Sequence, residues 1–444
     1  MKHSKPNIIY IVCHDLGKHL GCYGARVMSP NLDRFAAQGV KFTQAFCNAP
    51  ACSPSRGCAM TGLYSHNNGL MGLVNRGWSM PESCPTIVDY LNEAGYETVH
   101  FGFQHERYSA RANRYKICGN DTLVETYAEN AISRAIEYLE SNKGSGKPFY
   151  MNIGTWEVHA TSWQGNYVKE RLEVYNDGIE DEAYIPDYTP DTLEIRKEML
   201  KFQSCIRYLD KQVQRLFDTV ERLGYEENTL VIFTTDHGIG NMRAKGTLYD
   251  RGTEITLLMQ MPGTIGEGVV ISELIQNIDI TPTLLEVAGL EIPPSIQGRS
   301  FWKLLTGGEY TPHNEIFIER NYHGGYDPMR SVRTKRFHYI RNFGENIKKA
   351  WLPHEIPYMN KEYKAWYIEL WPEPSLPRER EELFDIVADP WEFNNLAYDP
   401  EYSEVKKDLA KKMERWMEST NDPLLQGEIP DKLYGWPENY KKKT

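Results

Sequence analysis

The sequence predicts an α/β fold: a large domain with a mostly parallel central sheet flanked by helices, then a small α+β domain with an antiparallel sheet. Between Asn7 and Ser300, nearly continuous apolar runs alternate with helical patterns, as expected for parallel strands buried on both faces. From about Pro312, apolar and polar residues alternate, which is typical of antiparallel strands. A chain of 444 residues also exceeds what one core normally accommodates. We therefore expect domains over residues 1–311 and 312–444.

Buried strands of the large domain are predicted where apolar residues run almost uninterrupted for the length of one strand. The clearest run is Thr229–Thr235, and Asn7–Cys13 has a similar composition. The complete set is Asn7–Cys13, Val40–Phe46, Glu97–Phe101, Pro148–Gly154, Thr229–Thr235 and Ile255–Met261.

Helices are predicted between these strands from apolar residues at three- and four-residue spacing. The longest pattern begins at Asp191 and ends at Gly224, a residue type that commonly terminates helices. The predicted helices are Asn31–Gly39, Thr86–Gly95, Ala128–Leu139, Asp191–Gly224 and Asp279–Gly289. The polar segment Gln164–Pro190 is expected to form a long loop over the active face.

The small domain is predicted to combine alternating strands with one amphipathic helix. Strands are expected at Ile316–Ile318, Arg330–Ile340 and Glu382–Ile386. The helix Glu401–Thr420 carries its apolar residues along one face and can therefore cover this sheet.

The charge of the chain excludes some classes of partner. A formal net charge of −11 argues against nucleic acid and against an anionic membrane surface. No apolar run has transmembrane length and no secretory signal precedes the first strand, so we expect a cytoplasmic location for the chain as given. The eight cysteines lack paired metal-type spacing, and all except Cys52 are expected to be reduced thiols in or near the core.

One short helix is predicted to carry the reaction centre. In Cys52-Ser53-Pro54-Ser55-Arg56, the proline suits the first helical turn, and Gly62 suits the C-terminal cap. Cys52 would then lie at the N-terminus of a helix, where free N–H groups and the positive end of the dipole meet. Arg56 adds a cation with a planar fork one turn later. This combination predicts a site for a tetrahedral oxyanion beside a nucleophile.

Acidic and histidine side chains follow four of the predicted strands. Because the carboxyl ends of parallel strands share one edge of a sheet, and ligands bind beyond that edge, we expect these side chains to converge. They are Asp15, His105, His159, Asp236 and His237. Any one of them is compatible with an ordinary turn, but their joint placement with Cys52 predicts a catalytic rim.

The cysteine stretch resembles the motif of the type I sulfatases, in which the cysteine is oxidised to formylglycine after translation. The resemblance covers nearly the full length and implies an alkaline-phosphatase-like fold with the site on the large domain. Other matching stretches are Asn7-Ile8-Ile9 with Asp15, Thr234-Thr235-Asp236-His237-Gly238, Asp279-Ile280-Thr281-Pro282-Thr283, Gln297-Gly298-Arg299-Ser300, and Glu382-Leu383-Phe384-Asp385 with Asn395-Leu396-Ala397.

The resemblance implies one divalent metal at this site. Its ligands would be Asp15, Asp236, His237 and the modified Cys52, with His14 as a further candidate ligand. A carboxylate-rich shell makes Ca²⁺ the expected metal, with Mg²⁺ also suited to it. The histidine nitrogen makes Mn²⁺ or Zn²⁺ alternatives.

The resemblance also implies catalytic roles. The residues concerned are Cys52, Arg56, His105, His159, Asp236 and Lys245. The alkoxide of hydrated formylglycine would attack sulfur with Asp236 as proton acceptor, while Arg56 holds the sulfuryl group. His159 or Lys245 would protonate the leaving atom, and His105 would help the second hydroxyl to expel sulfate. Because an unmodified cysteine cannot complete this cycle, a formylglycine-generating maturation enzyme is an expected partner.

Two positions depart from the family pattern. Many sulfatases carry a second aspartate where this chain has His14, and a lysine where it has Phe103. The first difference removes a negative charge from the metal site. The second removes a cation from the sulfate subsite.

Within the family, the chain looks most like the heparan N-sulfatases (sulfamidases), particularly at His66–Leu73 and Ile185–Pro190. The expected substrate is therefore a small sulfated aminosugar of the N-sulfoglucosamine type, or another saccharide derived from glycosaminoglycans. His323 and Arg330 either contact the sugar or lie in a surface loop. A phosphonate monoester or phosphodiester hydrolase of the same superfamily, favoured by Asp236-His237, and a non-catalytic sulfated-glycan binder are the alternative functions.

Overall fold

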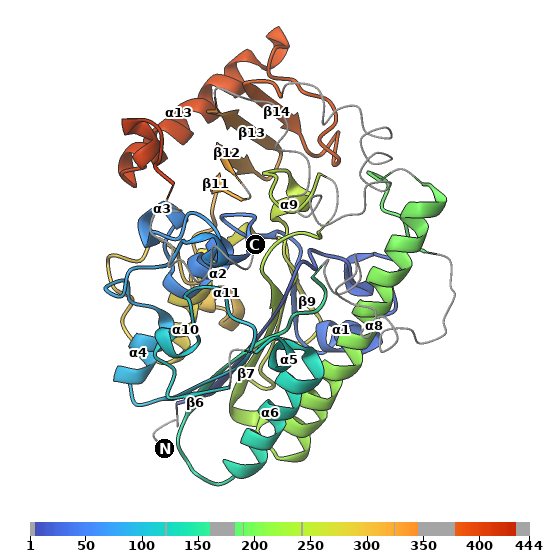
Figure 1. Ribbon diagram of the computed structural model, residues 1–444, viewed down its shortest axis with the longest axis vertical. Helices are drawn as coiled ribbons and strands as arrows, with labels where there is room; N and C mark the ends of the chain where they lie inside the picture. The colour runs from blue at the N-terminus through green and yellow to red at the C-terminus, as the bar shows by residue number, and fades with distance from the viewer. Residues whose placement is uncertain are drawn as a thin grey trace, which may run out of the picture.

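A computed structural model of the protein describes residues 5–119, 122–159, 183–189, 191–240, 243–323, 325–344 and 378–431. Figure 1 shows a large lower part built on one sheet and a smaller upper part in which α13 (Ser403–Ser419) lies over a second sheet. The first sheet is mostly parallel and the second antiparallel, which confirms the predicted fold class. Among the described residues, no helix combines the length and apolarity that crossing a bilayer requires.

Eight strands form the central sheet of the large part. They are β1 (Asn7–Cys13), β2 (Val40–Phe42), β4 (Glu97–Gly102), β5 (Ile117–Cys118), β6 (Phe149–Gly154), β7 (Thr229–Thr235), β8 (Leu257–Gln260) and β9 (Val269–Ile271), in the order β5-β4-β6-β1-β7-β8-β2-β9. Strands β4, β6, β1 and β7 are parallel neighbours, whereas β8 is antiparallel to β7. Val12 pairs with both Gly154 and Thr234, so the carboxyl ends of the three central strands are level.

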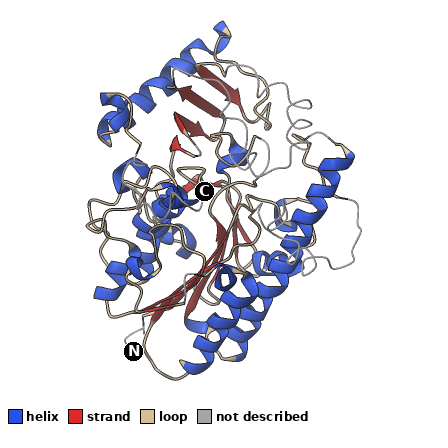
Figure 2. Ribbon diagram, in the orientation of Figure 1, coloured by secondary structure: helices blue, strands red, loops and turns tan. Residues whose placement is uncertain are grey.

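Helices cover both faces of this sheet (Figure 2). Ile9 and Ile11 of β1 pack on one side, and Ile8 and Tyr10 on the other, as the two-residue period of a strand requires. The first face is covered by α1 (Pro30–Ala37), α6 (Ala128–Ser141) and α8 (Leu193–Arg222). The second face is covered by α2 (Cys52–Thr61), α4 (Ile87–Glu93), α10 (Ile280–Val287) and α11 (Trp302–Thr306).

The predicted helices of the large domain form at the expected places. Helix α4 begins with a capping box between Thr86 and Asp89, which satisfies two backbone N–H groups at its first turn. Helix α8 is followed by Gly224, whose φ of 73° suits a residue without a side chain. Local capping and the apolar stripe therefore specify these helices together.

Three predictions about strands and loops need correction or fall outside the structure. The prediction of one strand over Val40–Phe46 is wrong, because the chain forms two strands there. The N–H and hydroxyl of Thr43 donate to the carbonyl of Ile271 where β2 ends. The chain then forms β3 (Ala45–Phe46), which pairs with β10 (Ile275–Gln276). The single strand expected at Arg330–Ile340 is wrong, because a turn divides it into two. Most of the loop Gln164–Pro190 lies outside the described residues, and 183–189 has no regular structure.

The small part is a four-stranded antiparallel sheet with one long helix. Its strands are β11 (Glu315–Tyr322), β12 (Tyr326–Thr334), β13 (Phe337–Asn342) and β14 (Glu381–Asp385). On one face, α13 contributes Leu409, Met413 and Trp416 to a cluster that also contains Tyr64 and Ile278 of the large part. The two parts are therefore joined by a shared apolar core. The boundary at residue 312 stays a prediction.

Buried ion pairs also join the two parts. Asp250, in α9 (Asp250–Thr253), accepts two hydrogen bonds from Arg333 of β12, at 3.1 and 2.9 Å. Arg251 lies 3.3 Å from Glu392, and His338 lies 2.6 Å from the other oxygen of the same carboxylate. The group Asp250, His338 and Glu392 also has the composition of a metal site, and its two carboxylates are paired with Arg333 and Arg251.

We predict that Arg333→Gln lowers the free energy of unfolding by about 3 kcal/mol, because it leaves the buried Asp250 carboxylate unpaired. Burial raises the pKa of Asp250, but Arg333 outweighs burial and holds the pKa at about 2. The pair therefore stabilises the protein above the ordinary pKa of aspartate, and this stabilisation is lost as the pH falls through about 2. The measurement is denaturant unfolding at neutral and acidic pH.

Arg336→Gln is the matched control for this prediction. Arg336 also pairs with a carboxylate of the small sheet, but its side chain is 64% exposed. Its replacement should leave the unfolding transition almost unchanged. Equal destabilisation by the two variants would contradict the role given to the buried pair.

Candidate active site

The site lies where β1 and β7 end and α2 begins. Asp15 follows β1 in a tight turn with a φ of 56°, and Asp236 follows β7 directly. The N–H of Gly17 donates to the carbonyl of His237 at 3.0 Å, so the turn after β1 is bonded to the turn after β7. At Gly238, a Cβ would overlap the carbonyl oxygen of Arg251. The two carboxylates are thus brought together by close backbone packing that glycine permits.

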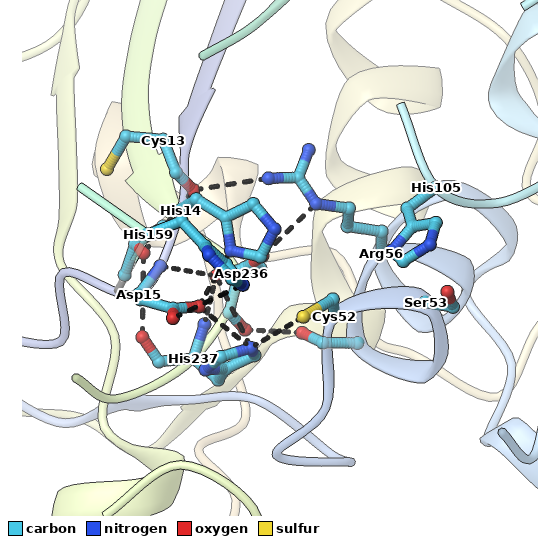
Figure 3. A network of polar contacts seen from close by, with 12 residues as sticks. Cys13, His14, Asp15, Cys52, Ser53, Arg56, His105, His159, Asp236 and His237 are labelled. Carbon is cyan, nitrogen blue, oxygen red and sulfur yellow. Dashed lines mark hydrogen bonds and ion pairs between the residues drawn. The ribbon is translucent and has the colours of Figure 1, made fainter. Parts of the chain in front are cut away.

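Five buried side chains with metal-ligand chemistry meet at this point. They are His14, Asp15, Cys52, Asp236 and His237, and one potential ligand atom from each lies within 4.8 Å of all the others. Figure 3 shows the imidazoles and carboxylates turned toward one another beside the sulfur of Cys52. His14 Nδ1 is 2.7 Å from Asp15 Oδ1 and 3.1 Å from Asp236 Oδ2. His237 Nε2 is 3.4 Å from both Asp15 Oδ1 and Cys52 Sγ.

The chemistry of these donors fits a divalent cation. His237 Nδ1 lies 2.9 Å from the carbonyl oxygen of Gly238, so it carries the proton and donates it there. Nε2 of His237 is consequently left as a lone-pair donor that faces the carboxylates. Asp15 and Asp236 are both negatively charged, buried and close to the same two histidines. A positive charge between their carboxylates would therefore stabilise them.

Two cations approach the carboxylates from outside this cluster. Lys245 Nζ lies 2.8 Å from Asp15 Oδ2 and 3.1 Å from His159 Nε2. Arg56 Nε donates to Asp236 Oδ2 at 3.2 Å, and its Nη2 donates to the carbonyl of Cys13 at 3.3 Å. The third nitrogen of Arg56, Nη1, is buried and has no hydrogen-bond partner among the described residues. It is therefore available to an anionic ligand beside Cys52.

Aromatic rings form one wall of the site. The ring of Phe103 lies 4.9 Å from the guanidinium carbon of Arg56 and 4.8 Å from the ring of His14. Trp156 contacts both Phe103 and His159, at 4.9 and 4.8 Å between ring centroids. Phe103 thus supports Arg56 through a cation–π contact at a position where a second cation would repel it.

The pKa of Asp236 reflects these neighbours. Burial alone would raise it, but His14, His237 and Arg56 outweigh burial and hold the pKa of Asp236 well below its ordinary value. Asp236 is therefore a carboxylate at neutral pH. Burial, reinforced by the charge of Arg56, lowers the pKa of His105 to about 3, so this imidazole is neutral at the same pH.

Comparisons with known proteins identify the family. A family model described as Sulfatase matches residues 6–290. The chain belongs to the sulfatase family. A second model, described as the C-terminal part of N-sulphoglucosamine sulphohydrolase, matches residues 237–368.

Individual relatives of this sulfatase share its length but are distant in sequence. An ulvan-active sulfatase of Formosa agariphila is 28% identical, with 96% of this chain and 82% of the relative covered. Human N-sulphoglucosamine sulphohydrolase is 24% identical, with 96% and 93% covered. A solved protein in complex with its substrate D-glucosamine-2-N,6-O-disulfate has a TM-score of 0.75 at 20% identity, with 94% and 98% covered. This last likeness establishes the fold alone.

Most of the residues singled out in the sequence lie together in the sulfatase structure. The strands that precede Asp15, His105, His159 and Asp236 are neighbours in the central sheet, as predicted. His105 lies on the far side of the Arg56 side chain from the two carboxylates (Figure 3). The catalytic and metal-binding roles of these residues stay predictions.

The two residues expected to contact the sugar differ in position. The ring of His323 lies against Gly246, since a Cβ there would come within 2.7 Å of His323 Nδ1, so this histidine borders the Lys245 loop. The prediction for Arg330 is wrong. Its fully buried guanidinium is bonded to Asp422 at 2.5 and 2.8 Å, which leaves it a structural role inside the small part.

Sequence reasoning missed Glu106 and Trp156. Glu106 is buried, accepts the N–H of His105 at 3.1 Å, and has a pKa that burial raises above the ordinary value. Its position directly after His105 was the signal that could have identified it. Trp156 precedes His159 by three residues in the turn after β6, and its ring packs against the ring of His159.

We predict that removing the metal with a chelator destabilises the protein, because the two buried aspartates then lose their shared positive charge. At a metal concentration about 100 times the dissociation constant, the loss is about 3 kcal/mol. The measurement is the midpoint of thermal unfolding before and after chelation, and after metal is restored. Asp236→Asn should abolish the response, whereas Asp250→Asn, which also alters a buried aspartate paired with arginine, should retain it. If chelation left the midpoint of thermal unfolding of the parent protein unchanged, that result would contradict a metal at this site.

Proposed function

We propose that this protein hydrolyses the sulfate group of a sulfated aminosugar by way of a formylglycine made from Cys52. The observation that carries the proposal is the position of Cys52: buried at the first turn of α2, 3.4 Å from His237, with Arg56 one helical turn later. This places a modifiable side chain between a cation and a cluster of metal ligands. After conversion to hydrated formylglycine, one hydroxyl oxygen would lie near the position that Cys52 Sγ occupies here.

The residues present fit the first half of such a reaction. A bound dication would lower the cost of forming an alkoxide at position 52. Asp236, ionised at neutral pH, would accept the hydroxyl proton. The oxygen would then attack sulfur, while the free nitrogen of Arg56 and the ammonium of Lys245 bind the sulfuryl oxygens and stabilise their charge.

The second half requires a proton for the leaving group and the release of sulfate. Lys245 and His159 lie 3.1 Å apart, so they form a pair that can deliver a proton to the departing amine or alcohol as its bond to sulfur breaks. Removal of the proton from the second hydroxyl at position 52, for which His105 is the proposed acceptor, re-forms the aldehyde. The carbon–oxygen bond to sulfate breaks in the same step, and free sulfate departs.

N-sulfoglucosamine is the substrate we propose. The C-terminal model that matches residues 237–368 is that of N-sulphoglucosamine sulphohydrolase, and a relative of this name aligns over 93% of its length. His323, beside the Lys245 loop, is the proposed contact of the small part with the sugar. Turnover of a phosphonate monoester is the second candidate, because a phosphonate monoester is a tetrahedral monoanion, like a sulfate ester, and would suit the same cations beside Cys52.

The proposal predicts sulfate release from N-sulfoglucosamine by protein co-expressed with a formylglycine-generating enzyme. Cys52→Ala should abolish release, because alanine offers no oxygen for attack. The measurement is free sulfate by ion chromatography, with 6-O-sulfated N-acetylglucosamine and a phenyl phosphonate as competing substrates. Cys84→Ala, which alters a cysteine outside the site, should retain full activity.

Each outcome of this assay discriminates between functions. Release from only the 6-O-sulfated sugar would keep the mechanism and reject the N-sulfated substrate. Turnover of only the phosphonate would move the function to the second candidate. Binding of the sugars without any turnover, in protein whose Cys52 is fully converted, would favour a glycan-binding protein.

A second prediction concerns the ring below Arg56. Phe103→Leu should raise the KM for the sulfated sugar about fivefold, which corresponds to the loss of about 1 kcal/mol from the cation–π contact that orients Arg56. Phe101→Leu is the control, because Phe101 lies two residues earlier, in β4, and packs in the core outside the site. It should lower stability without changing KM, and equal KM values for the two variants would refute the role of Phe103.

A further inference from the structure

We infer that this site selects a transition-metal dication of the Zn²⁺, Mn²⁺ and Co²⁺ class over Ca²⁺, and that His14 decides the selection. This reverses the choice of Ca²⁺ expected from the sequence. The inference rests on the proposed function only in assuming that a metal binds between Asp15 and Asp236. It concerns which metal binds there and can be tested without any turnover.

The first argument is the number of nitrogen donors. Ca²⁺ in proteins is held by six to eight oxygen atoms, whereas imidazole favours transition dications. Here two imidazoles belong to the donor cluster, and His14 Nδ1 lies between the carboxylates of Asp15 and Asp236, at 2.7 and 3.1 Å. A nitrogen therefore stands where an oxygen-rich shell would need another carboxylate.

The second argument is how few oxygens remain free. Asp15 Oδ2 is bonded to Lys245 at 2.8 Å, and Asp236 Oδ2 is bonded to Arg56 at 3.2 Å. Asp236 Oδ1 also accepts the backbone N–H groups of Asp15 and His237, each at 3.0 Å. Only part of the capacity of the two carboxylates is therefore left for a metal. These two cations also offset part of the negative charge of the two carboxylates, so less of that charge is left to attract a hard ion such as Ca²⁺.

The third argument concerns position 52 before its conversion. Cys52 Sγ lies 3.4 Å from His237 Nε2 and belongs to the donor cluster. A thiolate is a strong ligand for Zn²⁺ and Co²⁺ and a poor one for Ca²⁺. Protein with unconverted Cys52 should therefore bind the transition dication even more selectively than converted protein.

The test is a competition among metals on the full chain. Protein stripped by a chelator is incubated with an equimolar mixture of Zn²⁺, Mn²⁺, Ca²⁺ and Mg²⁺, desalted, and analysed for bound metal by mass spectrometry. We expect a transition metal to exceed Ca²⁺ at least tenfold, with one ion per chain. Ca²⁺ as the main bound metal would overturn the inference.

The variant His14→Asp tests whether His14 determines which metal binds. It should shift the ratio of transition metal to Ca²⁺ by at least tenfold toward Ca²⁺, because a carboxylate replaces an imidazole. His159→Asn is the matched control, since its ring packs 4.4 Å from that of His14 but lies outside the donor cluster, and it should keep the selection. An unchanged ratio in folded His14→Asp would overturn the role of His14.

A spectroscopic measurement covers the case in which His14→Asp fails to fold. Co²⁺ bound to the unconverted parent protein should show a sulfur-to-metal charge-transfer band that Cys52→Ala removes, together with ligand-field bands of a mixed nitrogen and oxygen shell. An all-oxygen spectrum would overturn the inference. Because no readout depends on turnover, a protein that selects Zn²⁺ but releases no sulfate refutes only the proposed function. A protein that releases sulfate but holds Ca²⁺ as its main metal in the competition refutes only this inference.

Discussion

Two buried carboxylates within reach of the same histidines are the constraint on which this structure depends. Asp15 and Asp236 follow adjacent parallel strands whose ends are level, so the sheet itself forces them together. Their repulsion inside the protein must be balanced, and Arg56 and Lys245 supply positive charge next to them. The two carboxylates also belong to a cluster of side chains that could hold a metal ion. The helix that carries Cys52 begins at the same edge of the sheet, so Cys52 lies beside these carboxylates and cations.

Most of the fold could be predicted because it depends on local pattern. Buried parallel strands such as Thr229–Thr235 have an apolar composition that few other structures require, and the long stripe of α8 is equally specific. The strand expected at Val40–Phe46 failed because pairing with Ile271 and Ile275 divides it, and partners so distant in sequence leave no local trace. The turn within Arg330–Ile340 was missed because it is made by Lys335 and Arg336, and neither lysine nor arginine is a residue type that is common in turns.

The candidate site was predictable to the level of which side chains meet, and less so in how they meet. Motif and strand order were enough to bring Cys52, Asp236 and His159 to one rim. They were not enough to place Arg330, whose burial against Asp422 depends on the chain more than ninety residues later. Nor could they show that Phe103 supports Arg56. In the sequence, phenylalanine in place of lysine indicates only the loss of a cation, and the contact between its ring and the Arg56 guanidinium is evident only in the structure.

The contact between Gly246 and the small part has a consequence for how this protein can evolve. Lys245 is bonded to Asp15 on one side, while the carbonyl of the next residue accepts a hydrogen bond from Arg320 of β11. The small sheet thus holds in place a loop whose cation contacts the candidate metal-ligand cluster. A shortened descendant that kept only the large part would retain every candidate metal ligand but would lose the support of this loop. The small part is therefore needed to position Lys245, and replacing it with another domain would remove this support.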